Sequence, residues 1–263
     1  MISIIVTVYN KEKFIQRTLN SILHQSLLPK QVIIINDGST DGSLEQINKL
    51  NLPTSYQIIT TKNNGVSNAR NLGINEAKFP FIYFVDGDDI IEPNALEIFT
   101  YAMVNFPNRS LYAANRKNEK GVRKINNISS KEFSFHQHLE YLIRFQNLCW
   151  TSAVVVNKKL AAKTLFNTKF SHGEDRDFFM NILQHEQGYW IDEVVATYIS
   201  DPSGLSAKPI SVHEDLYWIR INENKKQIKR GLYFYYYCFK YRAANIINNL
   251  KQAQYRKALS WMK

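Results

Sequence analysis

One segment near the middle of the chain constrains its fold more than any other. The apolar run Phe81–Val85 leads directly into three carboxylates, at Asp86, Asp88 and Asp89. An apolar run of this length predicts a strand buried on both faces, as in the parallel sheets of α/β proteins. The carboxyl ends of such strands are where open α/β sheets bind ligands. Asp-Gly-Asp is also common in turns and before helices, so the tripeptide alone leaves a purely structural role open.

The N-terminal part of the chain repeats this unit. Apolar runs typical of strands alternate with segments of helical spacing. The expected strands are Ile2–Val8, Gln31–Ile35, Tyr56–Thr61 and Phe81–Val85, and the expected helices are Lys11–Gln25, Leu44–Leu50, Ser67–Ala77 and Pro93–Asn105. Strands separated by short helices indicate βαβ units, so we predict an α/β fold with a mostly parallel central sheet flanked by helices.

The pattern is weaker after Pro107, where a polar and basic stretch extends to about residue 130. The elements expected beyond this point are strands at Leu111–Ala114, Ala153–Val156 and Tyr189–Ile199, and helices at Phe133–Phe145 and Asp177–His185. We therefore divide the chain into a first half of one domain (1–107), a second half of the same domain (108–215) and a helical C-terminal extension (216–263).

Composition excludes several classes of protein. A chain of 263 residues with 44% apolar and 21% charged residues has the balance of a globular protein with a sizeable core. No apolar run approaches the roughly 20 residues of a membrane span, and the N-terminus lacks the basic leader of a signal peptide. The two cysteines, Cys149 and Cys238, are expected to be reduced thiols in a cytoplasmic protein.

Polar groups follow each of the four N-terminal strands. They lie in Thr7–Asn10, Asp37–Asp41, Asn63–Asn71 and Asp86–Asp89. The carboxyl ends of parallel strands meet at one edge of a sheet, so we expect these groups to line one crevice suited to a nucleotide. The crowded aspartates favour a hard divalent cation, Mg²⁺ or Mn²⁺. The chain lacks both Gly-x-Gly-x-x-Gly and Gly-Lys-Ser/Thr, so dinucleotide-binding and P-loop sites lack their defining parts.

In these segments the chain resembles the inverting family-2 glycosyltransferases, which have the GT-A fold and transfer sugars from nucleotide donors. The resemblance covers residues 1 to about 205 and keeps the family's order. Its matching pieces are Ser3–Asn10, Val32–Asp41, Asn64–Asn71, Phe84–Pro93 and Gly173–Phe178.

The resemblance implies roles for individual residues. Those expected to bind the nucleotide are Thr7, Tyr9, Asp37, Asn64, Arg70 and Asp86. Among them, Tyr9 would pack on the base, Asp37 would accept a uracil-type N–H, and Arg70 would reach the base or the diphosphate. Turn, cap and surface roles remain open for each of these side chains. Asp86 would hold the ribose and Asp88 the metal, with Asp89 supporting either residue; Asp86 is also a candidate ligand of the Mn²⁺ or Mg²⁺ ion.

The second half of the chain is expected to supply the reacting groups. Inversion needs a base that takes the proton of the acceptor hydroxyl, and a carboxylate is the usual solution. The resemblance assigns this role to Asp175, with Glu174 orienting the acceptor or the loop; an interaction with the dipole of the following helix is the alternative. Where the family often has a further His contact to metal or diphosphate, this chain has Asp201. Asp201 is therefore a third candidate metal ligand.

The C-terminal extension is basic and aromatic. Residues 216–263 contain eleven Lys and Arg, one acidic residue and eleven aromatic residues, and so carry the whole formal charge of +10. Such a segment either lies on an anionic membrane surface or packs on the catalytic domain. Nucleic acid binding is not expected, because the rest of the chain is neutral and contains no known binding module.

We therefore predict a glycosyltransferase acting in lipopolysaccharide, capsule or related surface polysaccharide synthesis, in the cytoplasm or peripheral on the inner face of the cytoplasmic membrane. Its donor would be a nucleotide sugar, with UDP favoured, and its acceptor a saccharide or lipid-linked saccharide. Two alternatives stay open. A sugar nucleotidyltransferase normally has a glycine-rich loop after its first strand, which this chain lacks. A non-catalytic scaffold would need neither the aspartate cluster nor the Glu174–Asp175 pair.

Overall fold

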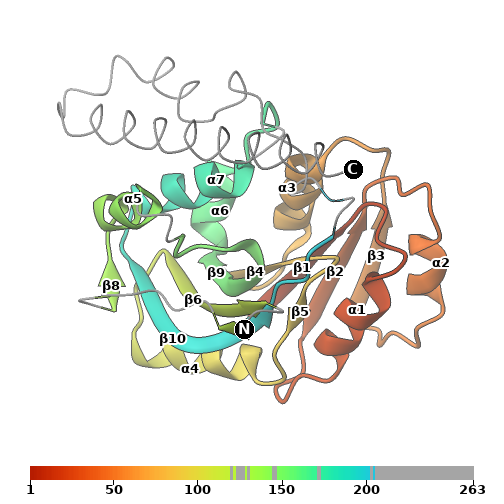
Figure 1. Cartoon of the computed structure of the whole chain (residues 1–263), viewed down its shortest axis with the longest axis horizontal. Coiled ribbons are helices and arrows are strands. Elements are labelled where there is room, and N and C mark those ends of the chain that lie inside the picture. The colour runs from red at the N-terminus through yellow and green to blue at the C-terminus, as the bar shows by residue number, and fades with distance from the viewer. Residues whose placement is uncertain are drawn as a thin grey trace, which may run out of the picture.

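The computed structural model describes residues 1–118, 121–122, 128, 131–143, 147–170, 173–201 and 204. Their strands form a single mixed sheet with helices on both faces (Figure 1). The sheet runs without interruption from the first predicted half of the domain into the second. The predicted C-terminal extension, residues 216–263, lies outside the described residues.

The N-terminal part forms the parallel half of the sheet. Its strands stand in the order β3-β2-β1-β4, and each adjacent pair is parallel. Their bounds are β1 (Ile2–Val8), β2 (Gln31–Asn36), β3 (Tyr56–Thr60) and β4 (Phe81–Asp86), and the helices between and after them are α1 (Ile15–Leu23), α2 (Ser43–Asn48), α3 (Val66–Glu76) and α4 (Ala95–Asn105). The alternation predicted from the sequence is therefore confirmed.

The second half of the sheet continues in the order β9-β6-β10-β5. Here β9 is antiparallel to both β4 and β6, whereas β10 is parallel to β6, so β6 and β10 run in the same direction as the N-terminal strands. Its elements are β5 (Ile90–Ile91), β6 (Leu111–Asn118), β7 (Gly121–Val122), β8 (Glu132–Phe133), α5 (Phe135–Ile143), the 3-10 turn η1 (Thr151–Ala153), β9 (Val154–Asn157), α6 (Lys158–Thr164), α7 (Glu174–Leu183) and β10 (Gly188–Thr197).

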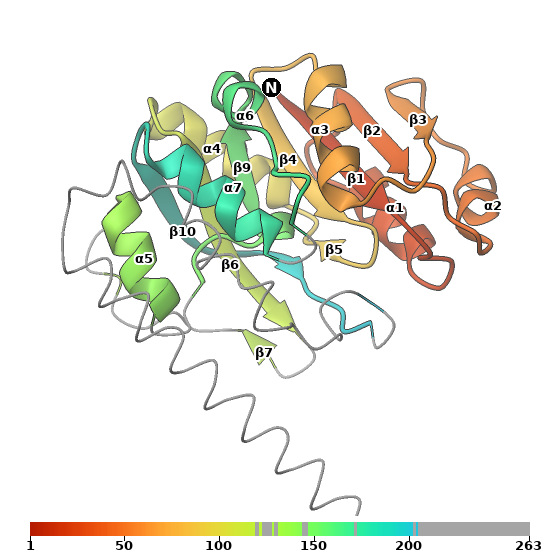
Figure 2. The same ribbon diagram turned by 90° about the horizontal axis from the view of Figure 1, so that it is seen from above.

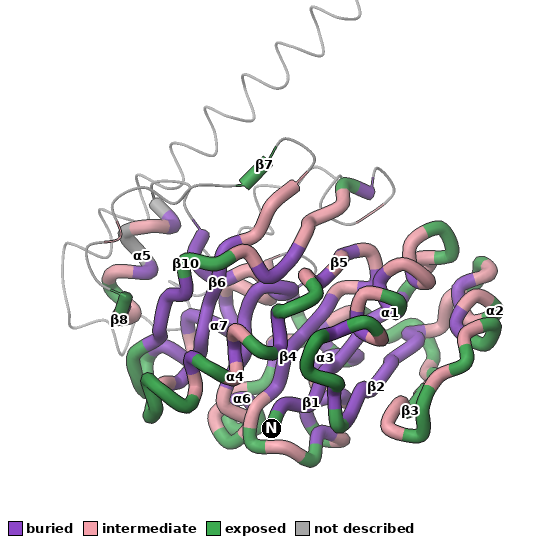
Figure 3. Tube along the Cα trace, turned by 90° about the horizontal axis from the view of Figure 1, so that it is seen from below, coloured by how far each residue is buried: buried purple, intermediate pink, exposed green. Residues whose placement is uncertain are grey.

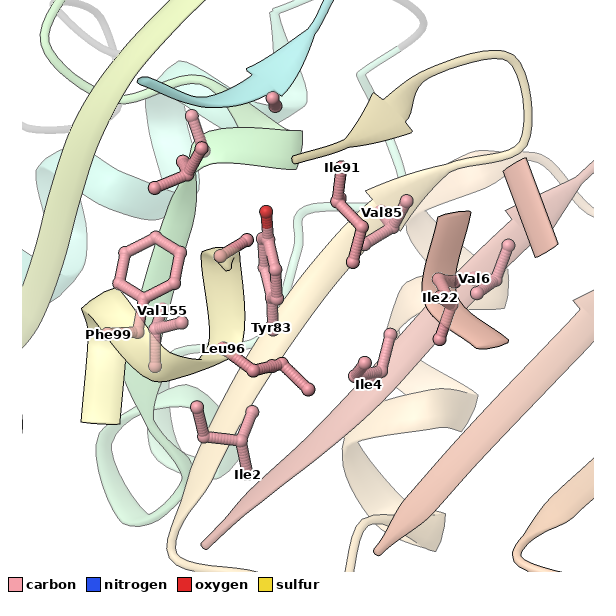
Figure 4. Close-up of a cluster of buried hydrophobic side chains, with 14 of the residues drawn as sticks. Ile2, Ile4, Val6, Ile22, Tyr83, Val85, Ile91, Leu96, Phe99 and Val155 are labelled. Atoms are coloured by element: carbon pink, nitrogen blue, oxygen red, sulfur yellow. The ribbon is translucent and has the colours of Figure 1, made fainter. Parts of the chain in front are cut away.

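Alternate residues of the strands divide the core into two layers. On one face, Ile4 and Val6 of β1 pack with Tyr83 of β4 and with side chains of α1 and α4 (Figure 4). On the other face, Ile5 and Phe84 pack with side chains of α3, α6 and α7, which cover that side of the sheet in Figure 2. Buried residues follow β1, β2 and most of β4, whereas β3 at the edge of the sheet is intermediate or exposed, as Figure 3 shows. Strand β1 is buried along its whole length and lies between β2 and β4 in the sheet.

Several elements differ from the sequence prediction, among them the short strands β5, β7 and β8, which were not predicted. Helix α7 begins at Glu174, three residues before the predicted start, because Gly173 adopts φ +68° and turns the chain directly into the helix. Strand β6 extends four polar residues beyond Ala114, of which the first three pair with β10 and Asn118 pairs with β7. Helix α6 was not predicted. Among the described helices, none combines the length and the apolar character needed to cross a bilayer.

Acid should destabilise this fold through His138. This side chain is fully buried on α5, with Nδ1 3.9 Å from the Cys149 sulfur, and burial together with Arg176 lowers its pKa to about 3. Between pH 6.5 and 3 the unfolded chain binds a proton that the folded chain does not. The free energy of unfolding therefore falls as pH decreases, by up to about 1.4 kcal/mol per pH unit.

We expect His138→Leu to reduce this dependence in urea unfolding measured across that pH range. His136→Leu is the matched control, because His136 lies on the same helix but is exposed. Equal slopes in wild type and His138→Leu would contradict the assignment.

Candidate active site

The chain changes sides of the sheet at β1, and the topology of open α/β sheets places a ligand crevice at such a change. The helix after β1, α1, packs on one face, whereas the helix before β4, α3, packs on the other. Open α/β sheets bind ligands outside the carboxyl ends of the strands at such a point. Thr7 of β1 and Asp86 of β4 are paired in register there. Two of the predicted nucleotide-binding residues therefore lie where the topology favours a ligand.

The turn after β4 lies directly against the end of β1. The N–H of Gly87 donates to the carbonyl of Thr7 at 3.0 Å, and the N–H of Asp89 donates to the carbonyl of Asp86 at 3.0 Å. A Cβ atom at Gly87 would lie 2.8 Å from the Thr7 carbonyl oxygen, too close for any other residue without movement of the backbone. The glycine between the aspartates therefore allows β1 to hold the turn in a fixed position.

Arg70 on α3 joins two carboxylates beneath the surface. Its Nη2 lies 2.8 Å from Asp86 Oδ1 and its Nη1 lies 2.8 Å from Glu174 Oε1, while only 3% of the residue is exposed. Burial alone would lower the pKa of Arg70, but Asp86 and Glu174 outweigh it and raise this pKa above its ordinary value. The structure thus shows a carboxylate bridge at Arg70, while its contact to a nucleotide stays a prediction.

The first turn of α7 carries the predicted reacting groups. Glu174 is buried, and burial raises its pKa, although Arg70 opposes this shift. Asp175 is partly buried, and its Oδ1 accepts the backbone N–H of Arg176 at 2.8 Å. Carboxylates at this end of a helix are also favoured by its dipole. Arg70 links Asp86 to Glu174 through two ion pairs, and Asp175 is the residue that follows Glu174.

Lys11 brings together the other two predicted metal ligands. Its Nζ lies 2.5 Å from Asp88 Oδ2 and 2.7 Å from Asp201 Oδ2. Burial by itself lowers the pKa of Lys11, but the two carboxylates raise it above its ordinary value, so the side chain is an ammonium. Asp88 and Asp201, far apart in the sequence, therefore place oxygens around one cation position.

This donor set fits the predicted divalent cation. Mg²⁺ is usually bound by one or two carboxylates together with substrate phosphates and water. The Oδ2 atoms of Asp88 and Asp201 already converge on the ammonium of Lys11, which marks a position where positive charge is stabilised. Asp86 is close by in the same turn, with about a third of its side chain exposed. Within the described part of the chain, no three His, Cys, Asp or Glu side chains gather closely enough to form a metal site by themselves, so phosphate or water would supply the remaining ligands.

Asp89 is buried beside the other two aspartates and contacts the segment that follows β10. It is 7% exposed, and its Oδ1 accepts the N–H of Ile199 at 3.2 Å, just beyond β10. Burial, and then the charges of Asp86 and Asp88, raise its pKa to about 8, while a hydrogen bond from Ser152 lowers it. This contact fixes the segment that leads to Asp201.

The predicted base-binding residues lie at the ends of β1 and β2. Asp37 is buried, and its carboxylate accepts the Thr61 hydroxyl at 3.0 Å and the backbone N–H groups of Asn64 and Gly65 at 3.0 and 2.8 Å. It therefore shapes the loop before α3. Asn64 itself is exposed. Tyr9 is 44% exposed at the end of β1, as an aromatic that packs on a ligand would be.

The structure thus brings most predicted site residues into two linked groups. One group is Thr7, Asp86, Arg70, Glu174 and Asp175, and the other is Asp88 and Asp201. Sequence reasoning missed Lys11 and Ser152, whose hydroxyl accepts the Asp86 N–H at 3.1 Å. No sequence signal marked either residue, since their partners lie 66 to 190 residues away along the chain.

Known proteins share both the sequence and the fold of this chain. Residues 3–162 match the sequence model of a family described as Glycosyl transferase family 2. Hyaluronan synthase of Pasteurella multocida is 27% identical over 241 residues, covering 90% of this chain and 24% of that protein. Putative glycosyltransferase EpsH of Bacillus subtilis is 38% identical over 99 residues, covering 36% of this chain and 28% of that protein. The chain spans about a quarter of the length of these relatives.

A solved structure has the same architecture. S. aureus TarS in complex with UDP-GlcNAc superposes with a TM-score of 0.72 at 20% identity, covering 90% of this chain and 69% of that chain. At this identity the match shows the fold alone. It confirms the predicted GT-A fold.

Proposed function

The chain belongs to glycosyl transferase family 2, and on this premise we propose that it transfers a sugar from a nucleoside diphosphate donor to a hydroxyl group, with inversion at the anomeric carbon. One observation carries the proposal: contacts link the crevice between β1 and β4 to the first turn of α7. Thr7, Asp86, Arg70 and Glu174 form this series, and Asp175 follows directly. A donor bound at the sheet edge would thus have a carboxylate nearby for the acceptor.

In the proposed reaction, the acceptor oxygen forms a bond to the anomeric carbon while the bond from that carbon to the diphosphate breaks. The acceptor's proton passes to Asp175, and the nucleoside diphosphate leaves with the bonding electrons. Glu174, held by Arg70, fixes the position of Asp175. Much of the rate enhancement would come from this positioning.

Divalent-metal dependence is general in this family. We assign Mn²⁺ or Mg²⁺ to Asp88, with Asp86 and Asp201 as further ligands. When bound, the ion would neutralise charge that develops on the leaving diphosphate.

We propose a UDP-sugar as the donor. TarS, which has the same fold, was solved with UDP and with UDP-GlcNAc. In this chain Tyr9 would stack on the base, Asp37 would hold the loop beside it and accept a uracil-type N–H, and Asn64 would lie at the rim. For the acceptor we propose a saccharide or lipid-linked saccharide of a surface polysaccharide, since relatives include hyaluronan and chondroitin synthases. Residues 216–263 would then bring the enzyme to the inner face of the cytoplasmic membrane.

Calorimetry with UDP, GDP and dTDP, each with and without Mn²⁺, tests the donor site. We expect metal-dependent binding of UDP, and binding about tenfold weaker for Tyr9→Ala, because stacking of a base on an aromatic ring contributes about 1–3 kcal/mol. Tyr101→Ala is the matched control, since Tyr101 is an exposed aromatic on α4. Failure of all three nucleotides in the presence of metal would favour the scaffold alternative instead.

A further inference from the structure

Lys11 holds a cation position inside the crevice. Its backbone N–H donates to the hydroxyl of Ser43 at 2.7 Å, which fixes the start of the side chain against α2. The ammonium then lies within hydrogen-bond distance of Asp88 and Asp201, and only 15% of the Lys11 side chain is exposed. A lysine with a fixed backbone, a mostly buried side chain and two carboxylate partners is part of the site.

The charges of the site divide into two sets. Arg70 is shared by Asp86 and Glu174, and Lys11 is shared by Asp88 and Asp201, so each cation offsets part of the charge of two carboxylates. Arg70 is 3% exposed, and its planar fork is held by both carboxylates and by the Phe166 ring, so it has little freedom to leave. Lys11 carries a compact charge on a flexible four-carbon stem. Of these two cations, Lys11 is the one suited to move.

We propose that Lys11 is a built-in counterion that a divalent cation must displace, and that the displaced ammonium then pairs with the diphosphate of the donor. The proposal rests on the proposed function only for the identity of that diphosphate. An ammonium and a metal ion cannot share the Oδ2 atoms of Asp88 and Asp201, because two cations at such short separation repel strongly. Metal and lysine therefore exclude one another from this position.

This exchange makes metal and nucleotide binding depend on each other. Without nucleotide, a metal ion must remove Lys11 from two carboxylates with no new partner for the ammonium. With nucleotide present, the phosphate oxygens accept the displaced ammonium, so the same exchange costs less. By linkage, each ligand then raises the affinity of the other by the same factor. Lys11 would ensure that the site takes up metal chiefly together with its donor.

Mn²⁺ binding by Lys11→Met in the absence of nucleotide tests the exchange directly. Electron paramagnetic resonance of free Mn²⁺ gives the affinity without any activity assay. We expect Lys11→Met to bind Mn²⁺ at least about tenfold more tightly than wild type, within the usual range of such coupling. Lys13→Met is the matched control, because it removes the same charge from an exposed neighbour and should change the affinity less than about twofold. Equal or weaker Mn²⁺ binding by Lys11→Met would overturn the proposal.

Two further measurements complete the test. Saturating UDP should increase Mn²⁺ affinity by a smaller factor in Lys11→Met than in wild type, and an unchanged factor would count against the exchange. If Lys11→Met does not fold, Lys11→Gln replaces it, since a neutral amide keeps donors near both carboxylates; the same increase in Mn²⁺ affinity is expected. The Mn²⁺ affinity measured without nucleotide does not depend on UDP binding. A failure of the Lys11 exchange can therefore be distinguished from a failure of the proposed glycosyltransferase function.

Discussion

Asp175→Asn should lower turnover by about 100- to 10,000-fold and leave nucleotide affinity unchanged within about twofold, the range expected when a general base is removed. Asparagine keeps the size of the side chain and an oxygen that can accept the Arg176 N–H, as Asp175 does at 2.8 Å. It cannot accept a proton from an acceptor hydroxyl. The loss should therefore appear in the chemical step and not in binding.

The measurement is release of nucleoside diphosphate from the donor that calorimetry identifies, alongside nucleotide titrations of each variant. Glu186→Gln is a suitable control, because Glu186 is an exposed carboxylate just beyond the other end of α7. It should behave as wild type. Wild-type turnover by Asp175→Asn would show that another group takes the proton. Glu174→Gln would then test whether that group is Glu174.

The parallel half of the sheet is predictable from the sequence because its signals are local. Strands β1, β2 and β4 are largely buried on both faces and so appear as mostly apolar runs. The helices between them have helical spacing, and each predicted boundary falls within a few residues of the observed one except at α1. There the chain makes a turn up to Phe14 before the helix begins, and a period-based prediction cannot separate such a turn from a helix.

The second half resisted prediction for a physical reason. The polar end of β6 pairs through backbone hydrogen bonds with β10, and this pairing needs no apolar side chain to signal it. Helix α6 is short and begins with two lysines, so its apolar face is narrow; the Asn157 side chain caps it by accepting the Leu160 N–H at 3.2 Å. Elements defined by distant partners or by a cap leave little trace in local periodicity.

The site shows the same division. The residue types at the strand ends pointed to the crevice, and Thr7 and Asp86 do meet there in register. The sequence did not indicate which charged residues would pair, however, because the partners are far apart along the chain: Lys11 and Asp201 are 190 residues apart, and Arg70 and Glu174 are 104 residues apart. Resemblance to a family suggests roles for residues, but the three-dimensional structure is needed to show which charged side chains lie in contact.

Arg70→Met should lower the free energy of unfolding by about 3 kcal/mol, near the lower end of the range for breaking a buried ion pair. Methionine fills much of the same volume but leaves Glu174 buried and Asp86 partly buried without their shared cation. We take the lower end because a third of the Asp86 side chain is exposed and can be rehydrated. For a domain of this size the midpoint of thermal unfolding should fall by roughly 6–12 °C.

Removing the stranded charge should reverse part of this loss. Arg70→Met combined with Glu174→Gln is expected to be more stable than Arg70→Met alone, because a neutral amide costs less to bury than a carboxylate. Lys49→Met is the control, since Lys49 pairs with Glu45 on the exposed surface of α2 and its loss should not be measurable. Arg70→Lys should also destabilise the protein, because a single ammonium cannot reproduce the two-pronged contact of a guanidinium. If Arg70→Met unfolds at the wild-type temperature, the bridge contributes nothing measurable to the stability of the fold.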